Sequence, residues 1–277
     1  MKKIVLAYSG GLDTSIILKW LQKNFKAEVI AYTADIGQKI NRKKIIQNAK
    51  KLGVKKIIIE NLKNTFVKEY IFPMIRAHAM YEGKYLLGTS IARPLIGKRQ
   101  IAVAKKFKAF AVSHGSTGKG NDQIRFELAY SFFGKKIKII SPWRIWKLQS
   151  RTDLIKYAKD NKIPIPKDKK GSPPFSVDDN IFHTSTEGKI LENPRNKAPE
   201  HIFQRTVSLE RAPSKPTIVK IGFKNGDPIS INNKQLNPEK LLEKLNLIGG
   251  KNGVGRVDLV ENRFIGIKSR GVYETPG

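Results

Sequence analysis

The chain has 277 residues, of which 40% are hydrophobic, and a mean hydropathy of −0.38. A chain of this length buries roughly three quarters of its unfolded surface, so it can form one large domain or two moderate ones without disulfides or structural metals. Cysteine is absent, which excludes disulfides, thiolate metal sites and a cysteine nucleophile.

The formal net charge is +30, and most of the excess lies in the first half. Residues 1–150 hold 30 Lys and Arg against 8 Asp and Glu, and residues 151–277 hold 23 against 15. Basic surfaces attract nucleic acids, but RGG or RS tracts, zinc-finger strings and RNP-like strings are all missing. We interpret the lysines as a solvated surface and expect no nucleic-acid partner. Those on the outer faces of predicted helices include Lys43, Lys44, Lys50, Lys51, Lys105 and Lys106.

The first residues predict a strand. Their apolar run is too short for a signal peptide, and it meets Ser9-Gly10-Gly11 at once. No run of about 18 apolar residues occurs, so we expect no membrane span. A reducing cytoplasm fits the absence of cysteine.

Apolar segments that predict strands alternate with helical patterns, which indicates a parallel sheet covered by helices. The first helix carries Ile17, Trp20 and Leu21 on neighbouring turns. The second ends at Gly53, in the position that glycine favours after a helix, and carries Ile45, Ile46, Ala49 and Leu52. The predicted strands are residues 3–8, 28–33, 55–60, 109–112 and 137–140.

A further helix is predicted at about 148–162, and after Ile163-Pro164-Ile165-Pro166 the character of the chain changes. Two prolines in four residues do not fit a helix interior, so we place a domain boundary near residue 167. The predicted domains are residues 1–167, which are α/β, and 168–277, which are α+β. In the second we expect strands at Thr217–Phe223 and Phe264–Lys268 and a helix at about Pro238–Asn246.

Two glycine-rich loops lie between a strand and a helix. In Ser9–Ser15 the glycines allow a tight turn, while hydroxyls and free helix amides can bind phosphate oxygens. No lysine follows the second glycine, so this is not the loop of nucleoside triphosphatases. Gly115–Asp122 forms a second anion-binding corner, in which Lys119 is either a counter-charge or a mobile surface lysine.

The first loop resembles the S-G-G-x-D-x-S signature of pyrophosphate-loop enzymes, which cleave ATP between the α and β phosphates. Asp13 either assists Mg²⁺ binding or is a carboxylate favoured by the helix dipole. Within that superfamily, six strings resemble the argininosuccinate synthase family, in order and over essentially the whole chain. They are Ala7–Ser15, Tyr32–Gln38, Tyr81–Pro94, His114–Glu127, Phe175–Asn180, and Val260–Arg263 continuing through Gly266–Arg270 to Tyr273–Glu274.

The resemblance implies an N-terminal adenine-nucleotide domain of the HUP class with a parallel sheet, followed by a synthetase domain. It implies a ligase of arginine biosynthesis that converts ATP, L-citrulline and L-aspartate into argininosuccinate, AMP and diphosphate through citrullyl-AMP. It also implies a homotetramer, and because the chain stops at Gly277 we expect the family's C-terminal oligomerisation tail to be lacking.

The resemblance also assigns binding positions. The ATP positions are Ala7, Tyr8, Ser9, Gly10, Gly11, Leu12, Asp13, Thr14, Ser15, Ala34 and Gly115. The citrulline positions are Tyr85, Ser90, Asn121, Arg125, Ser176, Ser185, Glu261 and Tyr273. The aspartate positions are Thr117, Asn121 and Asp122.

These residue types suit citrulline, which is a zwitterion with a neutral ureido tail. Glu261 is the candidate for its ammonium, and Arg125, one helical turn after Asn121, suits its carboxylate. Arg125 could instead pair with Asp122 or Glu127 at the surface. We assign no catalytic acid or base and no protein metal cluster, and we interpret His114 and His183 as structural.

Two other functions stay open at this point. A tRNA-modifying pyrophosphate-loop ATPase would suit the charge, but the relatives that carry sulfur use cysteines and this chain has none. A degenerate, non-catalytic, basic RNA-binding relative would bind heparin and leave ATP intact. The two preserved loops favour the ligase.

Overall fold

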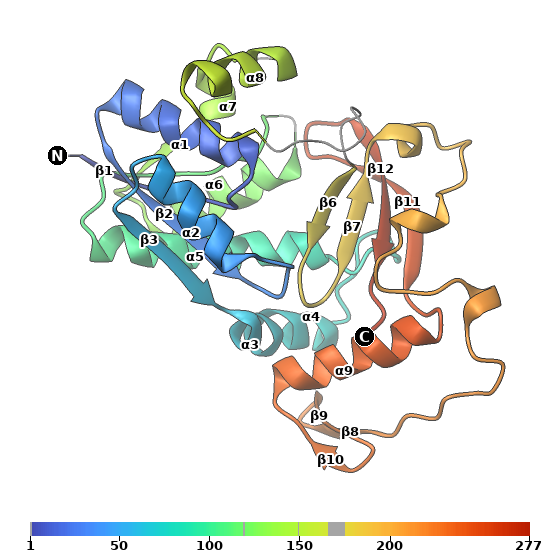
Figure 1. The fold of residues 1–277 in the computed structure, drawn as a ribbon. Coiled ribbons are helices and arrows are strands. Elements are labelled where there is room, and N and C mark those ends of the chain that lie inside the picture. Colours follow the sequence, from blue (N-terminus) through green and yellow to red (C-terminus); the bar gives the residue numbers. More distant parts are fainter. Residues whose placement is uncertain (1, 119, 149, 166–174) are drawn as a thin grey trace. The chain divides into compact units, whose positions relative to one another are not determined.

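The computed structural model describes residues 2–118, 120–148, 150–165 and 175–277, and its elements are labelled in Figure 1. The chain groups into two compact units. The first consists of Met1–Asp35, Ile40–Glu60 and Arg93–Pro173, and the second of Ile36–Lys39, Asn61–Ala92 and Pro174–Gly277. The predicted boundary near residue 167 lies outside the described residues.

The first unit contains a five-stranded sheet in the order β3-β2-β1-β4-β5. Strand β1 pairs in parallel with β2 and with β4, and β4 pairs in parallel with β5. The predicted parallel sheet is therefore confirmed. Its strands are β1 (Lys3–Ala7), β2 (Glu28–Asp35), β3 (Lys56–Asn61), β4 (Ala111–Ser113) and β5 (Lys138–Ile140).

Helices connect the strands, and their apolar stripes pack on the sheet. Ile16, Ile17 and Leu21 of the first helix are fully buried with Ile4 and Leu6 of β1 in one core. The helices are α1 (Leu12–Phe25), α2 (Arg42–Lys51), α5 (Gly88–Lys106), α6 (Asn121–Phe133), α7 (Pro142–Ile145) and α8 (Arg151–Asp160), and α5 begins with residues of the second unit.

Two helix ends compare directly with the sequence predictions. Gly53 follows α2 with φ +81°, as expected of a glycine after a helix. Helix α8 begins three residues later than predicted, because Ser150 caps it. The Ser150 hydroxyl accepts from Asp153 N at 3.1 Å, and the Asp153 carboxylate accepts from Ser150 N at 3.0 Å.

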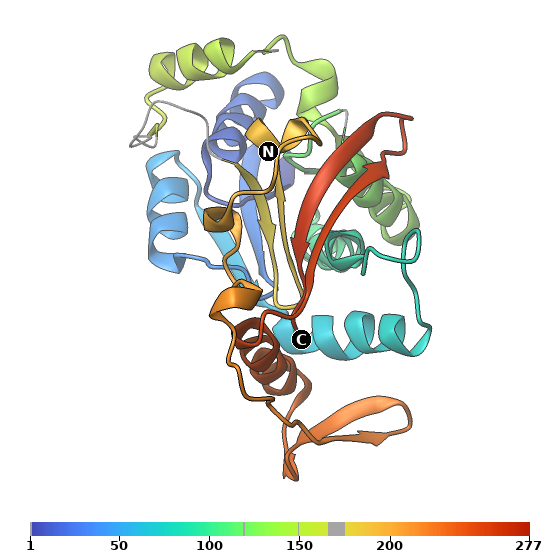
Figure 2. The ribbon, with the colours of Figure 1, turned by 90° about the vertical axis from the view of Figure 1, so that its right-hand side faces the viewer.

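The second unit contains two antiparallel sheets. Figure 2 shows the red strands β11 and β12 beside the yellow strands β6 and β7, and the sheet order is β11-β12-β7-β6. The smaller sheet has the order β10-β9-β8. The strands are β6 (Ser176–Asp179), β7 (Thr184–Glu187), β8 (Ile221–Lys224), β9 (Asp227–Ile231), β10 (Lys234–Gln235), β11 (Arg256–Asn262) and β12 (Lys268–Glu274).

Three predictions in this unit need correction. Phe264–Lys268 is not a strand, since residues 264–267 form the turn between β11 and β12 around Gly266, whose φ is +83°, and only Lys268 belongs to β12. In Thr217–Phe223 the strand begins only at Ile221. The predicted helix at 238–246 continues to Lys251.

The described helices of this unit are α3 (Lys63–Phe66), η1 (Val67–Ile71), α4 (Phe72–Arg76), η2 (Lys189–Glu192), η3 (Glu200–Ile202), η4 (Leu209–Arg211) and α9 (Pro238–Lys251).

Helix α9 begins with a proline behind an asparagine cap, because the Asn237 side chain accepts from Lys240 N. A small core of Leu191, Ile202 and Val272 lies beside β12. Among the described residues, no helix is both long and apolar enough to cross a bilayer.

Candidate functional site

The Ser9–Ser15 loop turns sharply at the carboxyl end of β1. Gly10 has φ +81°, and a Cβ there would lie 2.9 Å from Ile45 Cγ1, so only glycine fits this turn. Gly11 precedes α1, and no side chain caps the amides of the helix. Ser9 Oγ lies 3.1 Å from Thr14 Oγ1, which fixes two hydroxyls at the same corner. Loop and helix therefore form a site suited to phosphate.

The second loop packs against the first. A Cβ on Gly115 would lie 3.0 Å from Thr14 Cγ2, because β1 and β4 are neighbours in the sheet. Gly120 precedes α6 without a side-chain cap, so a second helix N-terminus opens at the same edge. Lys119 lies outside the described residues.

Helix α6 carries a partly buried ion cluster. Asp122 accepts from Arg93 Nε at 2.9 Å and from Arg125 Nη1 at 2.8 Å. Burial alone would raise the pKa of Asp122, but the two guanidinium groups lower it below its ordinary value. The expected pairing of Arg125 with citrulline stays a prediction. The hydrogen bond from Arg125 to Asp122 uses one of the five N–H donors of Arg125 and holds its guanidinium group in place.

His114 holds the second loop in place through hydrogen bonds. Its side chain is fully buried, and its Nδ1 accepts from Ser116 N at 3.2 Å. Its Nε2 lies 3.3 Å from Ser141 Oγ, which donates to Glu127 Oε1 at 2.6 Å. Hydrogen bonding from His114 lowers the pKa of Glu127 to about 2, against the opposing effect of burial.

In the second unit, one face of the four-stranded sheet gathers predicted citrulline residues. Tyr273 pairs with Ser185, Ser185 pairs with Asp178, and Val257 pairs with Tyr273. Paired residues share a face, as do residues two apart along a strand. The side chains on this face therefore include Glu261, Tyr273, Ser185 and Ser176.

Tyr273 is the centre of this face. Its hydroxyl donates to Glu261 Oε1 at 3.0 Å, and a Cβ on Gly271 would lie 2.3 Å from that hydroxyl. Glycine at 271 therefore leaves the space through which Tyr273 reaches Glu261. Burial raises the pKa of Tyr273, and the charge of Glu261 raises it further, so the phenol stays protonated and donates.

Tyr85 stacks on Tyr273 with ring centroids 4.6 Å apart, and His183 stacks on Tyr273 at 5.7 Å. His183 Nε2 lies 2.7 Å from Thr89 Oγ1, and the Tyr85 hydroxyl accepts from Thr89 N at 3.2 Å. A Cβ on Gly88 would lie 2.4 Å from the His183 ring, so glycine is required for this approach. The rings of Tyr85 and His183 thus pack against Tyr273 and position it on the sheet face.

The structure gathers the predicted site residues within each unit. The first unit holds the ATP and aspartate positions together with Asn121 and Arg125, and Ala34 lies near the end of β2. The second holds Tyr85, Ser90, Ser176, Ser185, Glu261 and Tyr273. Their binding roles stay predictions.

Three supporting groups were not predicted from the sequence: Arg93, the Glu127–Ser141 contact and Thr89. Arg93 and Thr89 lie inside the Tyr81–Pro94 string, which is the one signal that could have pointed to them. No cluster of three metal-ligating side chains occurs among the described residues. A single carboxylate beside a phosphate site, such as Asp13, still suits Mg²⁺, which binds through few protein groups and the phosphates themselves.

Comparisons with known proteins match the whole length of the chain. A family model described as the arginosuccinate synthase N-terminal HUP domain matches residues 3–164, and one described as the arginosuccinate synthase C-terminal domain matches residues 175–277. An argininosuccinate synthase of Pelagibacter ubique (strain HTCC1062) is 79% identical over 276 residues, which cover 100% of this chain and 70% of that protein. That of Parvibaculum lavamentivorans is 59% identical, over 100% of this chain and 68% of the relative.

A solved structure gives a weak match. It is the U34-tRNA thiolase NcsA from Methanococcus maripaludis with its 4Fe-4S cluster, and it aligns with 62% of this chain and 60% of its own chain at 15% identity and a TM-score of 0.39.

Proposed function

Because the chain belongs to the argininosuccinate synthase family, we propose that it joins citrulline to aspartate through citrullyl-AMP, with the residues of its two loops and its sheet face in the binding roles below. The chain is a ligase, and the tRNA-modifying alternative is not favoured. The observation that carries the residue assignment is the sheet face that gathers Glu261, Tyr273, Ser185 and Ser176.

ATP is held by the two loops. The uncapped amides of α1 and the Ser9 and Thr14 hydroxyls donate to the β and γ phosphates, which leave as diphosphate. Gly115 lets the second loop approach the nucleotide. Asp13 is the residue that would hold Mg²⁺, which would supply charge neutralisation on the phosphates.

Citrulline is recognised at both ends of its α-amino acid group. Glu261 accepts from the ammonium, and the Tyr273 hydroxyl keeps the Glu261 carboxylate in place. Arg125 donates to the carboxylate, and Asp122 fixes the guanidinium. Tyr85, Ser90, Ser176 and Ser185 supply the remaining polar contacts, together with the Asn121 amide.

The chemistry runs in two steps. The citrulline ureido oxygen attacks the α phosphorus, forming an O–P bond as the bond to diphosphate breaks. The aspartate amine, positioned by Thr117, Asn121 and Asp122, then attacks the ureido carbon. The C–O bond to AMP breaks, and the nitrogen releases its proton. Orientation and charge stabilisation carry this sequence without a dedicated base.

The test is an omission assay with purified protein and Mg-ATP. Argininosuccinate, AMP and diphosphate should appear together only when citrulline and aspartate are both present. Release of AMP with citrulline omitted would contradict the proposed order. ATP left intact in every mixture would contradict the proposal itself, with citrulline binding measured separately to confirm that the protein is folded.

A further inference from the structure

The first unit concentrates positive charge at one end of its sheet. The segments at the amino ends of the strands and the carboxyl ends of the preceding helices are residues 2–3, 23–28, 50–56, 105–111 and 134–138. Together they hold fourteen lysines and one acidic residue, Glu28. Of these lysines only Lys3 is partly buried, and the others are exposed. We call this set the lysine surface.

Topology is what brings these segments together. Parallel strands place their amino ends at one edge of a sheet, and the helices that return the chain end at the same edge. The two phosphate loops follow the carboxyl ends of β1 and β4, at the opposite edge. The lysine surface is therefore separate from the ATP positions.

Helix dipoles explain only part of this arrangement. Lysines in the last turn of a helix interact favourably with its dipole, as Lys50 and Lys51 do in α2. That reason does not apply to Lys55, which precedes β3, to Lys56, which begins it, or to the lysines around β5. Like charges gathered at one edge of a sheet repel one another, and a bound polyanion would relieve that repulsion.

Aromatic rings occur at the same end, and an apolar pocket reaches it with one of its own ends. Lys56 Nζ lies 5.3 Å from the Phe107 ring centroid, and Lys2 Nζ lies 5.4 Å from that of Phe110. These contacts hold two ammonium groups over half-buried rings. They reduce the freedom that such lysines would lose on binding a phosphate.

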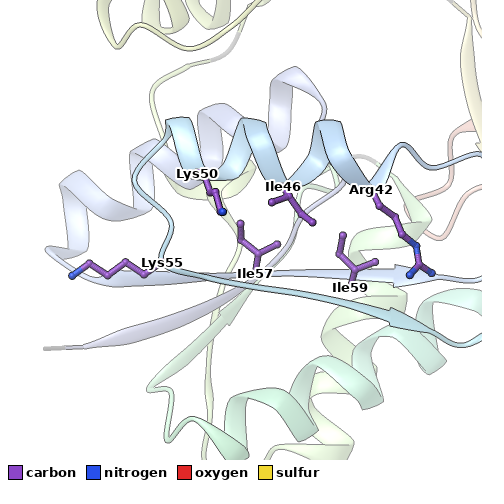
Figure 3. A pocket seen from close by; sticks show the side chains of 6 residues that line it. All are labelled: Arg42, Ile46, Lys50, Lys55, Ile57 and Ile59. Carbon is purple, nitrogen blue, oxygen red and sulfur yellow. The ribbon is translucent and has the colours of Figure 1, made fainter.

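The pocket lies between α2 and β3 and has a volume of about 310 Å³. Figure 3 shows Ile46 of α2 facing Ile57 and Ile59 of β3, with Lys50 and Lys55 toward one end and Arg42 at the other. Arg42 is paired with Asp35 at 2.8 Å, so the charge of the two lysines dominates the rim. Ile46, Ile57 and Ile59 thus form an apolar surface in the pocket, which we call the isoleucine floor. At the end with Lys50 and Lys55 the pocket reaches the lysine surface.

The pocket distinguishes between forms of nucleic acid. A duplex presents phosphates outside and stacks its bases inside, so it would leave the isoleucine floor in water. A single strand offers phosphates and unstacked bases with apolar faces together. We propose that the lysine surface binds single-stranded nucleic acid, with its lysines on the phosphates and one base on the isoleucine floor.

The test measures the binding of a labelled oligouridylate of about 20 nucleotides by fluorescence anisotropy between about 50 and 300 mM salt. One variant replaces six lysines of the surface with glutamine, and a matched variant replaces six exposed lysines of the second unit. The first carries K51Q, K55Q, K56Q, K106Q, K108Q and K136Q. The matched control carries K197Q, K215Q, K220Q, K224Q, K234Q and K251Q.

Each lost phosphate contact should reduce the slope of log K against log salt by about 0.7 for a single strand, so the first variant should lose about 2 to 4. The control should keep the wild-type slope within about 1, and both variants should keep wild-type argininosuccinate synthesis. Equal losses of slope in the two variants, or no binding by the wild type at about 50 mM salt, would overturn the proposal.

A further variant tests the isoleucine floor. Ile57→Thr keeps a β-branched side chain in an edge strand but removes apolar contact. Its affinity for oligouridylate should fall about threefold to tenfold at an unchanged salt slope. Its affinity for polyphosphate, which has no bases, should not change. If oligouridylate and polyphosphate respond alike, the base does not occupy the floor, and that part of the proposal fails.

Discussion

Glu261 is the residue on which the recognition of citrulline depends most directly. Glu261→Gln removes the negative charge but keeps the size, so the KM for citrulline should rise about tenfold to a hundredfold while that for ATP stays near the wild-type value. Steady-state kinetics with each substrate varied in turn measures both.

Asp258 supplies the matched control. It lies on the same strand three residues before Glu261, on the opposite face of the sheet, and pairs with Arg270 at 2.7 Å. Asp258→Asn should leave the KM for citrulline unchanged. Equal increases in the two variants would mean that the kinetics report damage to the strand.

Thr89 acts through His183, which makes it a positioning residue. Thr89→Val removes the hydroxyl that lies 2.7 Å from His183 Nε2, so the buried ring loses this polar contact. The loss should destabilise the fold by about 1 to 3 kcal/mol, and it should raise the KM for citrulline more than that for ATP. Thermal unfolding and kinetics measure the two effects.

Thr89→Ser keeps the hydroxyl and should restore both properties. If Thr89→Ser shows the same shift in KM as Thr89→Val, the methyl group matters and the hydrogen bond does not. The proposal that Thr89 positions His183 through this hydrogen bond would then be wrong.

Gly115 tests the contact between the two loops. Gly115→Ala would place a methyl group 3.0 Å from Thr14 Cγ2, so Thr14 must give way by a few tenths of an ångström, and the KM for ATP should rise about tenfold. Gly118→Ala lies in the same loop but meets no atom closer than 3.6 Å, and should bind ATP normally. A normal KM for ATP in both variants would contradict the proposed approach of the second loop to the nucleotide.

At the scale of elements, Glu127 of α6 links the helix to the loop after β4 and to the start of α7. Its pKa is lowered to about 2 from an ordinary value of 4.5. A lowered carboxyl pKa stabilises the fold above the ordinary value, and the stability is lost as the pH falls from about 4.5 toward 2. Glu127→Gln should therefore lower the melting temperature near pH 6.

The difference between the wild type and Glu127→Gln should shrink as the pH falls from about 4.5 toward 2, because the carboxyl of the unfolded wild type takes up its proton over this range while that of the folded protein stays ionised until about pH 2. Melting curves over this range by circular dichroism measure it. A difference that stays constant with pH would show that the charge of Glu127 does not stabilise the fold.

The elements also show what sequence patterns can predict. The five strands of the first unit were predictable because each is an apolar run followed by a helical pattern. Phe264–Lys268 misled because its apolar residues are exposed in a turn: Phe264 is 78% exposed and Ile267 is 48% exposed. Only pairing between β11 and β12 determines that these residues lie in the turn.

The site was predictable to different degrees. The two loops carry local signals, since glycine and hydroxyl residues between a strand and a helix predict a phosphate site. The grouping of Glu261, Tyr273, Ser185 and Ser176 on one face depends on the register of four strands, which no local pattern gives. Arg93 and Asp122 are 29 residues apart in the sequence, and their pairing depends on the packing of α5 against α6.

For the whole molecule, the net charge of +30 has a distribution that composition does not show. Composition alone favours a solvated surface, whereas parallel topology collects lysines at the end of the first unit away from the phosphate loops. The ligase reaction and the proposed nucleic-acid binding therefore depend on different residues, and each can be removed without the other.

The proposed reaction depends on attack of the citrulline ureido oxygen on the α phosphorus of ATP. Citrulline labelled with ¹⁸O in its ureido group tests it directly, with the products analysed by mass spectrometry after a single turnover in unlabelled water. AMP should carry one labelled oxygen, and diphosphate should carry none. Unlabelled AMP, with argininosuccinate formed, would mean that no citrullyl-AMP exists and would contradict the mechanism.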